Sequence, residues 1–135
     1  MTEQENVQAI QELYAAFHRG DFAAFLNTLA DEVEWLVPGP QQILPWAGLR
    51  KGQEQVAQFF AEFAQTAETQ QFEPREFIAQ GERVVVLGYR RDCVKATGRS
   101  FESEWAQVFS LRAGKIVNFH GYIDTAAIVA AFRGD

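Results

Sequence analysis

Three polar residues in the second half of the chain have the side-chain types that acid–base or anion-binding chemistry needs: Tyr89, Arg91 and Glu104. The segment ATGR (96–99) is a short turn signal with a glycine, and it predicts an antiparallel hairpin. With the turn at its Thr-Gly pair, Arg91 lies opposite Glu104, and Tyr89 lies opposite Ala106. A charge-assisted Arg–Glu pair enclosed in an apolar cavity would suit a general acid, a general base or a carboxylate-binding site.

The same pair of charges has an ordinary structural interpretation. An Arg–Glu pair near the tip of a hairpin is usually a solvated ion pair, which contributes little to stability. A slip of one residue in the strand register would also move each of these side chains to the opposite face. The sequence therefore leaves both the catalytic and the surface interpretation open.

A second candidate for a binding surface is the segment WLVPGPQQILPWAGL (35–49). It contains two of the three tryptophans, three of the four prolines and no charged residue. Prolines fix φ and so stiffen the segment, which predicts a semi-rigid wall at the rim of an apolar cavity. Trp35 and Trp46 would then contact a ligand, although ordinary core filling by these aromatic side chains is the alternative.

Helices in the first half and strands in the second half must position these residues. Apolar residues at helical spacing predict helices from Val7 to Phe17, from Phe22 to Leu29 and after Gly52. Alternating apolar residues predict strands, and short glycine-containing turns join most of them into an antiparallel meander. The arrangement indicates an α+β fold, with strands at 33–37, 72–79, 83–95, 99–112 and 115–123 and a closing helix at 125–132.

Composition excludes several classes of partner and site. The 135 residues fit one domain (1–135), and no apolar run is long enough for a membrane span or resembles a signal peptide. A net charge of −6 with scattered basic residues argues against nucleic-acid binding. The lone Cys93 fits the reducing cytoplasm. His18 and His120 have no spaced partners, so we expect no metal and no cofactor.

Six segments spread over nearly the whole chain carry a family resemblance. They are FHRGDF (17–22), LADEVEWLVPG (29–39), WAGLRKG (46–52), GERVVVLG (81–88), ATGRSF (96–101) and RAGKIVNFHGYIDTAA (112–127). Together they resemble the ketosteroid isomerase and SnoaL-like polyketide cyclase group of the nuclear-transport-factor-like superfamily. The resemblance implies a cone-shaped α+β fold, in which N-terminal helices pack on a curved, mostly antiparallel sheet that encloses an apolar pocket.

The resemblance also implies where an isomerase would carry its catalytic groups. Its base falls on Val37, its oxyanion-binding acid on Ala106 and its tyrosine on Leu13, with Tyr14 one residue away. Hydrocarbon side chains cannot move a proton, so steroid isomerisation by that mechanism is not expected. If Ala106 faces the pocket, cross-strand pairing and strand alternation place Tyr89, Arg91, Glu102 and Glu104 there too.

The SnoaL-like cyclases carry a histidine and an aspartate two residues apart on the last strand. By resemblance these positions fall on Phe119 and Gly121, which have no proton to exchange. His120 lies between them and should face the other side of the sheet. Asp124, just before the last predicted helix, is expected to be its N-cap rather than a catalytic group.

We therefore predict a pocket for a small hydrophobic or aromatic molecule, with either isomerase, cyclase or lyase activity or a purely binding or sensing role. A protein-interaction module is a third hypothesis. Phe101, Trp105 and Phe109 alternate opposite Ala106, which predicts an apolar stripe on the convex face and a homodimer through the sheet. The predicted ligand-binding residues are Trp35, Val37, Trp46, Phe59, Ala106, Phe119 and Gly121.

Overall fold

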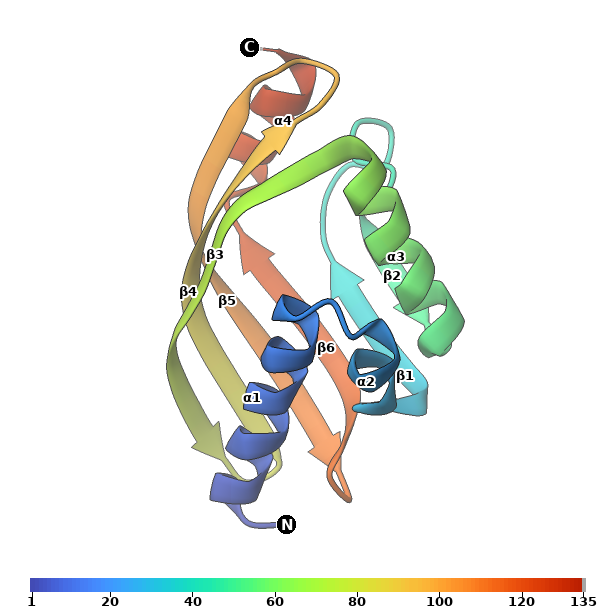
Figure 1. The fold of residues 1–135 in the computed structure, drawn as a ribbon, viewed down its shortest axis with the longest axis vertical. Coiled ribbons are helices and arrows are strands. Elements are labelled where there is room, and N and C mark those ends of the chain that lie inside the picture. The colour runs from blue at the N-terminus through green and yellow to red at the C-terminus, as the bar shows by residue number, and fades with distance from the viewer. Residues whose placement is uncertain (135) are drawn as a thin grey trace.

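A computed structural model describes residues 1–134, which form four helices and six strands (Figure 1). The chain begins with two helices, continues through a short hairpin and a third helix, and ends with a meander and a fourth helix. The elements are α1 (Glu3–His18), α2 (Phe22–Asn27), β1 (Leu29–Val37), β2 (Gly48–Lys51), α3 (Gly52–Thr66), β3 (Ala67–Gln80), β4 (Arg83–Val94), β5 (Ser100–Arg112), β6 (Lys115–Ile123) and α4 (Thr125–Arg133).

The strands of the described chain form one curved sheet in the order β2-β1-β6-β5-β4-β3. All neighbouring strands are antiparallel except β1 and β6, which run parallel and join the first strand to the last. Helices α1, α2 and α3 lie along the hollow side of this sheet, and α4 lies at the opposite end of the molecule from the N-terminus (Figure 1). The predicted α+β cone fold is confirmed.

Local sequence signals define the helix ends. Thr2 caps α1, because its hydroxyl accepts a hydrogen bond from the Glu5 N–H while the Glu5 carboxylate accepts one from the Thr2 N–H. Gly20 has a φ of 74°, which lets the chain reverse after α1. Asp21 then caps α2 by accepting a hydrogen bond from the Ala24 N–H at 3.1 Å. This reversal turns the chain back toward the sheet.

Asp124 is the N-cap of α4, as predicted, and its carboxylate accepts a hydrogen bond from the Ala127 N–H at 3.1 Å. Replacing Asp124 with alanine should lower the free energy of unfolding by about 1 kcal/mol, because a first-turn N–H loses its acceptor. Urea unfolding followed by circular dichroism measures this loss. Asp124→Asn is the matched control, because asparagine caps helices equally well, and an equal loss in both variants would contradict the capping role.

Two parts of the sheet differ from the prediction. The short strand β2, inside the uncharged segment, has too few residues to show a periodic pattern. Strand β3 begins at Ala67, five residues before the predicted start at 72. As predicted, it continues through Pro74, although proline usually interrupts a strand. This proline is tolerated because β3 is an edge strand and its register shifts between Pro74 and Glu76.

The hairpin between β4 and β5 has a longer loop than predicted. The Val94 N–H donates to the Arg99 carbonyl oxygen at 2.8 Å, and the Gly98 N–H donates back to the Val94 carbonyl oxygen at 2.8 Å. These bonds enclose a loop over residues 95–98. A turn of only two residues at the Thr-Gly pair is therefore wrong.

The longer loop shifts the register of the hairpin by two residues. Arg91 lies opposite Glu102, and Tyr89 lies opposite Glu104. The predicted pairs Arg91–Glu104 and Tyr89–Ala106 are therefore wrong. A shift of two residues leaves each side chain on its own face, so this error alone does not decide which residues face the hollow side.

The faces of β4 and β5 are opposite to those predicted. Val84 and Val86 are fully buried against the helices, and Phe101, Trp105 and Phe109 point the same way. The predicted apolar stripe on the convex face is thus wrong, because these three rings fill the hollow side instead. The cause is an alignment error of one residue at Ala106, which inverts a whole strand.

No helix within residues 1–134 combines the length and the apolar character that crossing a lipid bilayer requires.

Candidate functional site

The hollow side of the sheet and the helices packed on it enclose a cavity of about 100 Å³. Aromatic rings form most of its wall. Trp35 stacks on Phe119 with ring centroids 3.8 Å apart, and Phe72 stacks on Trp105 with centroids 5.0 Å apart. The stacked rings come from four different strands, β1, β6, β3 and β5, so the curvature of the sheet brings them to one space.

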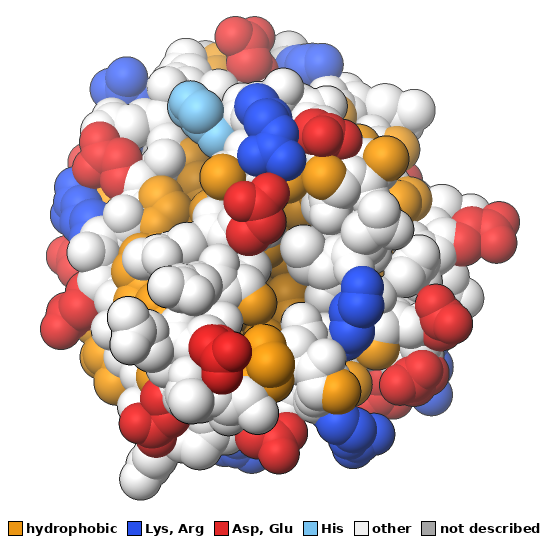
Figure 2. All heavy atoms as spheres, turned by 60° about the horizontal axis from the view of Figure 1, so that its bottom comes forward, with side chains coloured by type: hydrophobic (Ala, Val, Ile, Leu, Met, Phe, Trp, Pro, Cys, Tyr) orange, Lys and Arg blue, Asp and Glu red, His pale blue; other side chains and the backbone are white. Residues whose placement is uncertain are grey.

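The wall of this cavity extends to the protein surface. Phe17, at the end of α1, lines the cavity and is 36% exposed. The face in Figure 2 has a hollow with apolar side chains at its floor, and acidic and basic side chains are interspersed around it. Because charges of both signs are mixed, this face has no extended region of positive or negative electrostatic potential.

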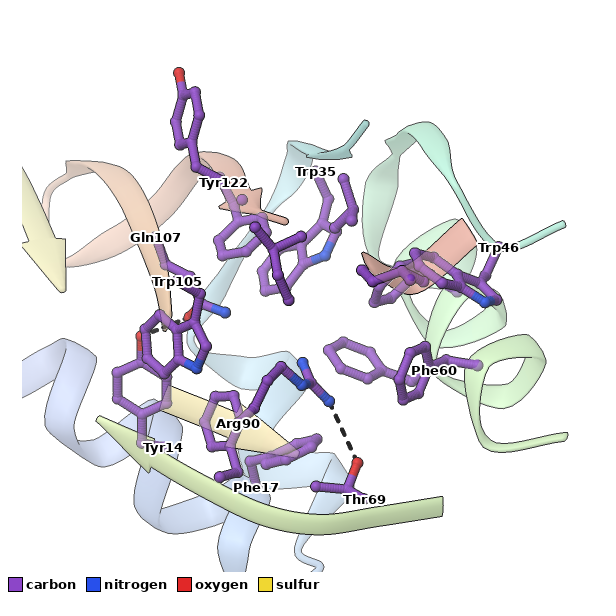
Figure 3. Close-up of a pocket in the computed structure, with 18 of the residues that line it drawn as sticks. Tyr14, Phe17, Trp35, Trp46, Phe60, Thr69, Arg90, Trp105, Gln107 and Tyr122 are labelled. Atoms are coloured by element: carbon purple, nitrogen blue, oxygen red, sulfur yellow. Dashed lines mark hydrogen bonds between the residues drawn. The ribbon is translucent and has the colours of Figure 1, made fainter. Parts of the chain in front are cut away.

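Arg90 is a cation within the aromatic wall. Its guanidinium lies over the rings of Phe63 and Phe72, at 5.1 Å from each centroid, and Figure 3 shows it extending between Trp105 and Phe60. Such contacts favour a guanidinium over other side chains at this position. Its Nη1 atom has no hydrogen-bond partner among residues 1–134, so this amino group is available to a ligand.

Asp92 holds the guanidinium of Arg90 in place from behind. This carboxylate is fully buried and accepts hydrogen bonds from Arg90 Nε at 2.7 Å, from Arg90 Nη2 at 2.9 Å and from the Thr69 hydroxyl at 2.7 Å. Arg90 and Asp92 are two residues apart on β4, so both face the hollow side. The bidentate pair fixes the plane of the guanidinium.

Tyr14 and Gln107 form the second polar group in the wall. The Tyr14 hydroxyl donates to Gln107 Oε1 at 2.6 Å, and the tyrosine ring packs against Phe77 and Phe109. Burial raises the pKa of the Tyr14 hydroxyl, so tyrosine stays protonated. Figure 3 shows that the amide nitrogen of Gln107 points into the open space.

All three tryptophans line the cavity, and none of their indole N–H groups has a hydrogen-bond partner among residues 1–134. Trp35, Trp46 and Trp105 are only 3%, 2% and 5% exposed. A buried donor without an acceptor destabilises the folded state by about 1 to 3 kcal/mol.

Most of the predicted ligand-binding residues line this cavity. They lie on β1, the segment before β2, α3 and β6, and their role in binding stays a prediction. Ala106 does not line the cavity, because it faces the convex side beside Leu87 and Tyr122. The residues in the cavity wall are Trp35, Val37, Trp46, Phe59, Phe119 and Gly121.

The three predicted catalytic residues lie outside the cavity. Tyr89, Arg91 and Glu104 are on the convex face of the sheet, where Tyr89 donates a hydrogen bond to Glu102 at 2.9 Å. No ion pair joins Arg91 to Glu104, both of which are exposed. Their predicted position in the cavity is wrong, because the one-residue alignment error at Ala106 inverted the faces of β4 and β5.

His120 faces the convex side, as strand alternation predicts. Its ring stacks on Tyr122 with centroids 4.1 Å apart, and Figure 3 shows Tyr122 pointing away from the cavity. Within residues 1–134, no three His, Cys, Asp or Glu side chains group in a way that would hold a metal ion.

Sequence reasoning missed the polar residues that do face the cavity. Arg90 and Asp92 alternate with Arg91, so the correct face of β4 would have identified both. The signal was available in the run VVV (84–86), whose outer two residues are the buried ones. Gln107 was missed because the face of β5 was inverted in the same way. Tyr14 was missed because the alignment placed the isomerase tyrosine on Leu13, one residue before it.

The model of the SnoaL-like domain matches residues 10–119, which is most of the chain. The chain belongs to the SnoaL-like family. This SnoaL-like chain is 38% identical to an NTF2-like protein from Burkholderia xenovorans LB400. The structural match covers 98% of each of the two chains, with a TM-score of 0.88. It is 28% identical to TerC, co-crystallised with polyporic acid, over 96% of this chain and 98% of TerC, with a TM-score of 0.85.

A curated relative is an uncharacterized protein from Mycobacterium tuberculosis (strain ATCC 25618 / H37Rv). It is 26% identical over 129 residues, which are 94% of the SnoaL-like chain and 95% of the relative. The relatives thus extend over nearly the same length as this chain.

Proposed function

We propose that this SnoaL-like chain binds one small aromatic molecule in the cavity. The observation that carries the proposal is an aromatic wall in which several buried hydrogen-bond donors have no acceptor. Stacked rings such as Trp35 on Phe119 favour a flat ligand, since a third ring can pack against them. Donors such as Arg90 Nη1 and the Gln107 amide nitrogen favour a ligand with an oxygen acceptor.

The size of the cavity sets the size of the ligand. An apolar protein cavity of about 150 Å³ is large enough to bind benzene, so a cavity of about 100 Å³ limits the ligand to about one aromatic ring. A larger ligand requires movement of the rings around Phe17, where the wall reaches the surface.

TerC supports the proposal, because this relative has been co-crystallised with polyporic acid. Sequence identity of 28% over nearly the full length makes a related type of ligand reasonable for this chain. The chemistry of the ligand in this chain then follows from its own wall residues.

The same donors favour a second candidate function, an isomerase, cyclase or lyase that stabilises an oxyanion. Donors fixed at the position of a developing negative charge lower the barrier of such reactions. The Gln107 amide is oriented by its bond to Tyr14, and Arg90 by its bonds to Asp92. Among the described residues that line the cavity, none is a carboxylate or an imidazole, so the ligand or water would accept the proton.

Intrinsic tryptophan fluorescence tests the binding proposal, because all three tryptophans line the cavity. One-ring aromatic molecules should cause a saturable change in emission. In Gly121→Leu, the added side chain extends toward the ring of Phe119 and takes up space in the cavity. The affinity for the ligand should therefore fall about tenfold or more. Ala106→Leu, on the convex face, is the matched control and should bind normally.

A saturable signal that is unchanged in Gly121→Leu would place the ligand elsewhere and contradict the proposal. Unfolding of both variants in urea separates loss of binding from loss of structure. Acid–base turnover is a separate question, and it is tested by proton exchange of an enolisable aromatic ketone in the presence of the protein.

We also propose a homodimer through the convex face of the sheet, in the cytoplasm. The interface residues differ from the predicted stripe of phenylalanine and tryptophan, which faces the hollow side. On the convex face, Leu87 is 37% exposed and Tyr122 is 51% exposed, with Ala106 between them. Burial of this apolar surface favours association. Sedimentation equilibrium of Tyr122→Glu should show a shift toward monomer, and an unchanged mass would contradict this interface.

A further inference from the structure

We infer that the cavity selects an aromatic carboxylate, whose oxygens bind the free edge of Arg90 and the Gln107 amide nitrogen. This inference rests on the proposed function and names the class of its ligand. It depends on which hydrogen-bonding atoms in the wall are free and which are already used.

The free polar atoms in the wall are donors. Arg90 Nη1 makes no hydrogen bond within residues 1–134, because the hydrogen bonds of Arg90 use its Nε and Nη2 atoms. The amide nitrogen of Gln107 faces the open space that Arg90 enters (Figure 3). The two donors come from the neighbouring strands β4 and β5. An anion with two oxygens can accept a hydrogen bond from each of them.

The acceptors near this space are already engaged. Asp92 accepts three hydrogen bonds, two from Arg90 and one from Thr69. Gln107 Oε1 accepts a hydrogen bond from the Tyr14 hydroxyl, and Thr69 Oγ1 accepts a hydrogen bond from Arg90 Nη2 at 3.3 Å. A ligand that presents an N–H or O–H donor therefore meets other donors, which disfavours amides, amines and alcohols.

The guanidinium is held in one orientation before any ligand arrives. Asp92 binds two of its nitrogens, and the rings of Phe63 and Phe72 lie against its face. Asp92 also balances its charge, so the empty site contains no unpaired buried ion. A ligand carboxylate can add to Nη1 without breaking the Arg90–Asp92 pair.

A comparison of matched ligands on the unmodified protein tests the inference. Benzoate, benzamide and toluene have similar shapes but different polar groups. Benzoate presents an anionic acceptor, benzamide presents a neutral amide with N–H donors and one carbonyl acceptor, and toluene presents no polar group. Benzoate should bind about ten- to hundredfold more tightly than benzamide, by tryptophan fluorescence and by calorimetry. Equal affinities for the two would overturn the inference. Binding of toluene would then still support the proposed function, whereas no binding of any of the three would contradict both.

A pair of variants tests the role of Arg90. Removing Arg90 alone leaves Asp92 buried without a partner, so the variant is Arg90→Met combined with Asp92→Leu, because apolar replacement of a buried pair is often tolerated. This variant should bind benzoate and benzamide with affinities within about threefold of each other and keep its affinity for toluene. Arg91→Met, one residue away on the convex face, should keep the preference for benzoate. An unchanged preference in the double variant would also overturn the inference.

Discussion

Replacing Asp92 with asparagine is expected to lower the free energy of unfolding by about 3 to 5 kcal/mol. The carboxylate is fully buried, and Arg90 binds it through two nitrogens. Asparagine has no negative charge, so the guanidinium would stay in an apolar wall without a counter-ion. Urea unfolding followed by tryptophan fluorescence measures the change.

The same substitution at Asp31 is the control. Asp31 is exposed on β1, so Asp31→Asn should change the free energy of unfolding by less than about 0.5 kcal/mol. The double variant Arg90→Met with Asp92→Leu removes both charges and should recover most of the stability that Asp92→Asn loses. A loss below about 1 kcal/mol in Asp92→Asn would mean that the ion pair contributes little.

Replacing Gly88 with alanine should lower the free energy of unfolding by about 1 to 3 kcal/mol, because no space exists for a methyl group. Gly88 lies opposite Trp105 in the hairpin. A Cβ atom there would lie 2.6 Å from Cη2 of Trp105 and would overlap the carbonyl oxygen of Glu73 on β3. Trp105 would have to move, which disturbs its stack on Phe72 and changes the near-ultraviolet circular dichroism.

Gly121→Ala is the matched control, since both glycines lie within strands. A Cβ at Gly121 would lie 3.4 Å from the Phe119 ring, which is ordinary contact. This variant should change the free energy of unfolding by less than about 0.5 kcal/mol. Equal losses in Gly88→Ala and Gly121→Ala would show that the close approach of Trp105 to β4 is not the cause.

Signals that act over a few residues were sufficient to predict most of the fold. The apolar spacing of α1, the cap at Asp124 and the glycine-containing turns all depend on neighbours in the sequence. The edge position of β3, which tolerates Pro74, depends on a partner strand and has no local signal. The parallel pairing of β1 with β6 likewise joins segments that are far apart in the chain.

The site was harder to predict, because strand alternation turns a small alignment error into a complete inversion. The wall positions on β1 and β6, such as Val37 and Phe119, were correct. On β4 and β5 the alignment placed Ala106 inward instead of Gln107, so Arg91 was selected instead of Arg90. Burial of Val84 and Val86, two residues apart, is the physical fact that decides the face.

The parallel pair of β1 and β6 has a consequence for how the protein is made. Trp35 is synthesised well before its stacking partner Phe119. A nascent chain that ends before β6 leaves β1 without this neighbour and the aromatic wall without one side. Pairing of distant segments also slows folding. The cavity is therefore complete only after β6 has been synthesised and has paired with β1.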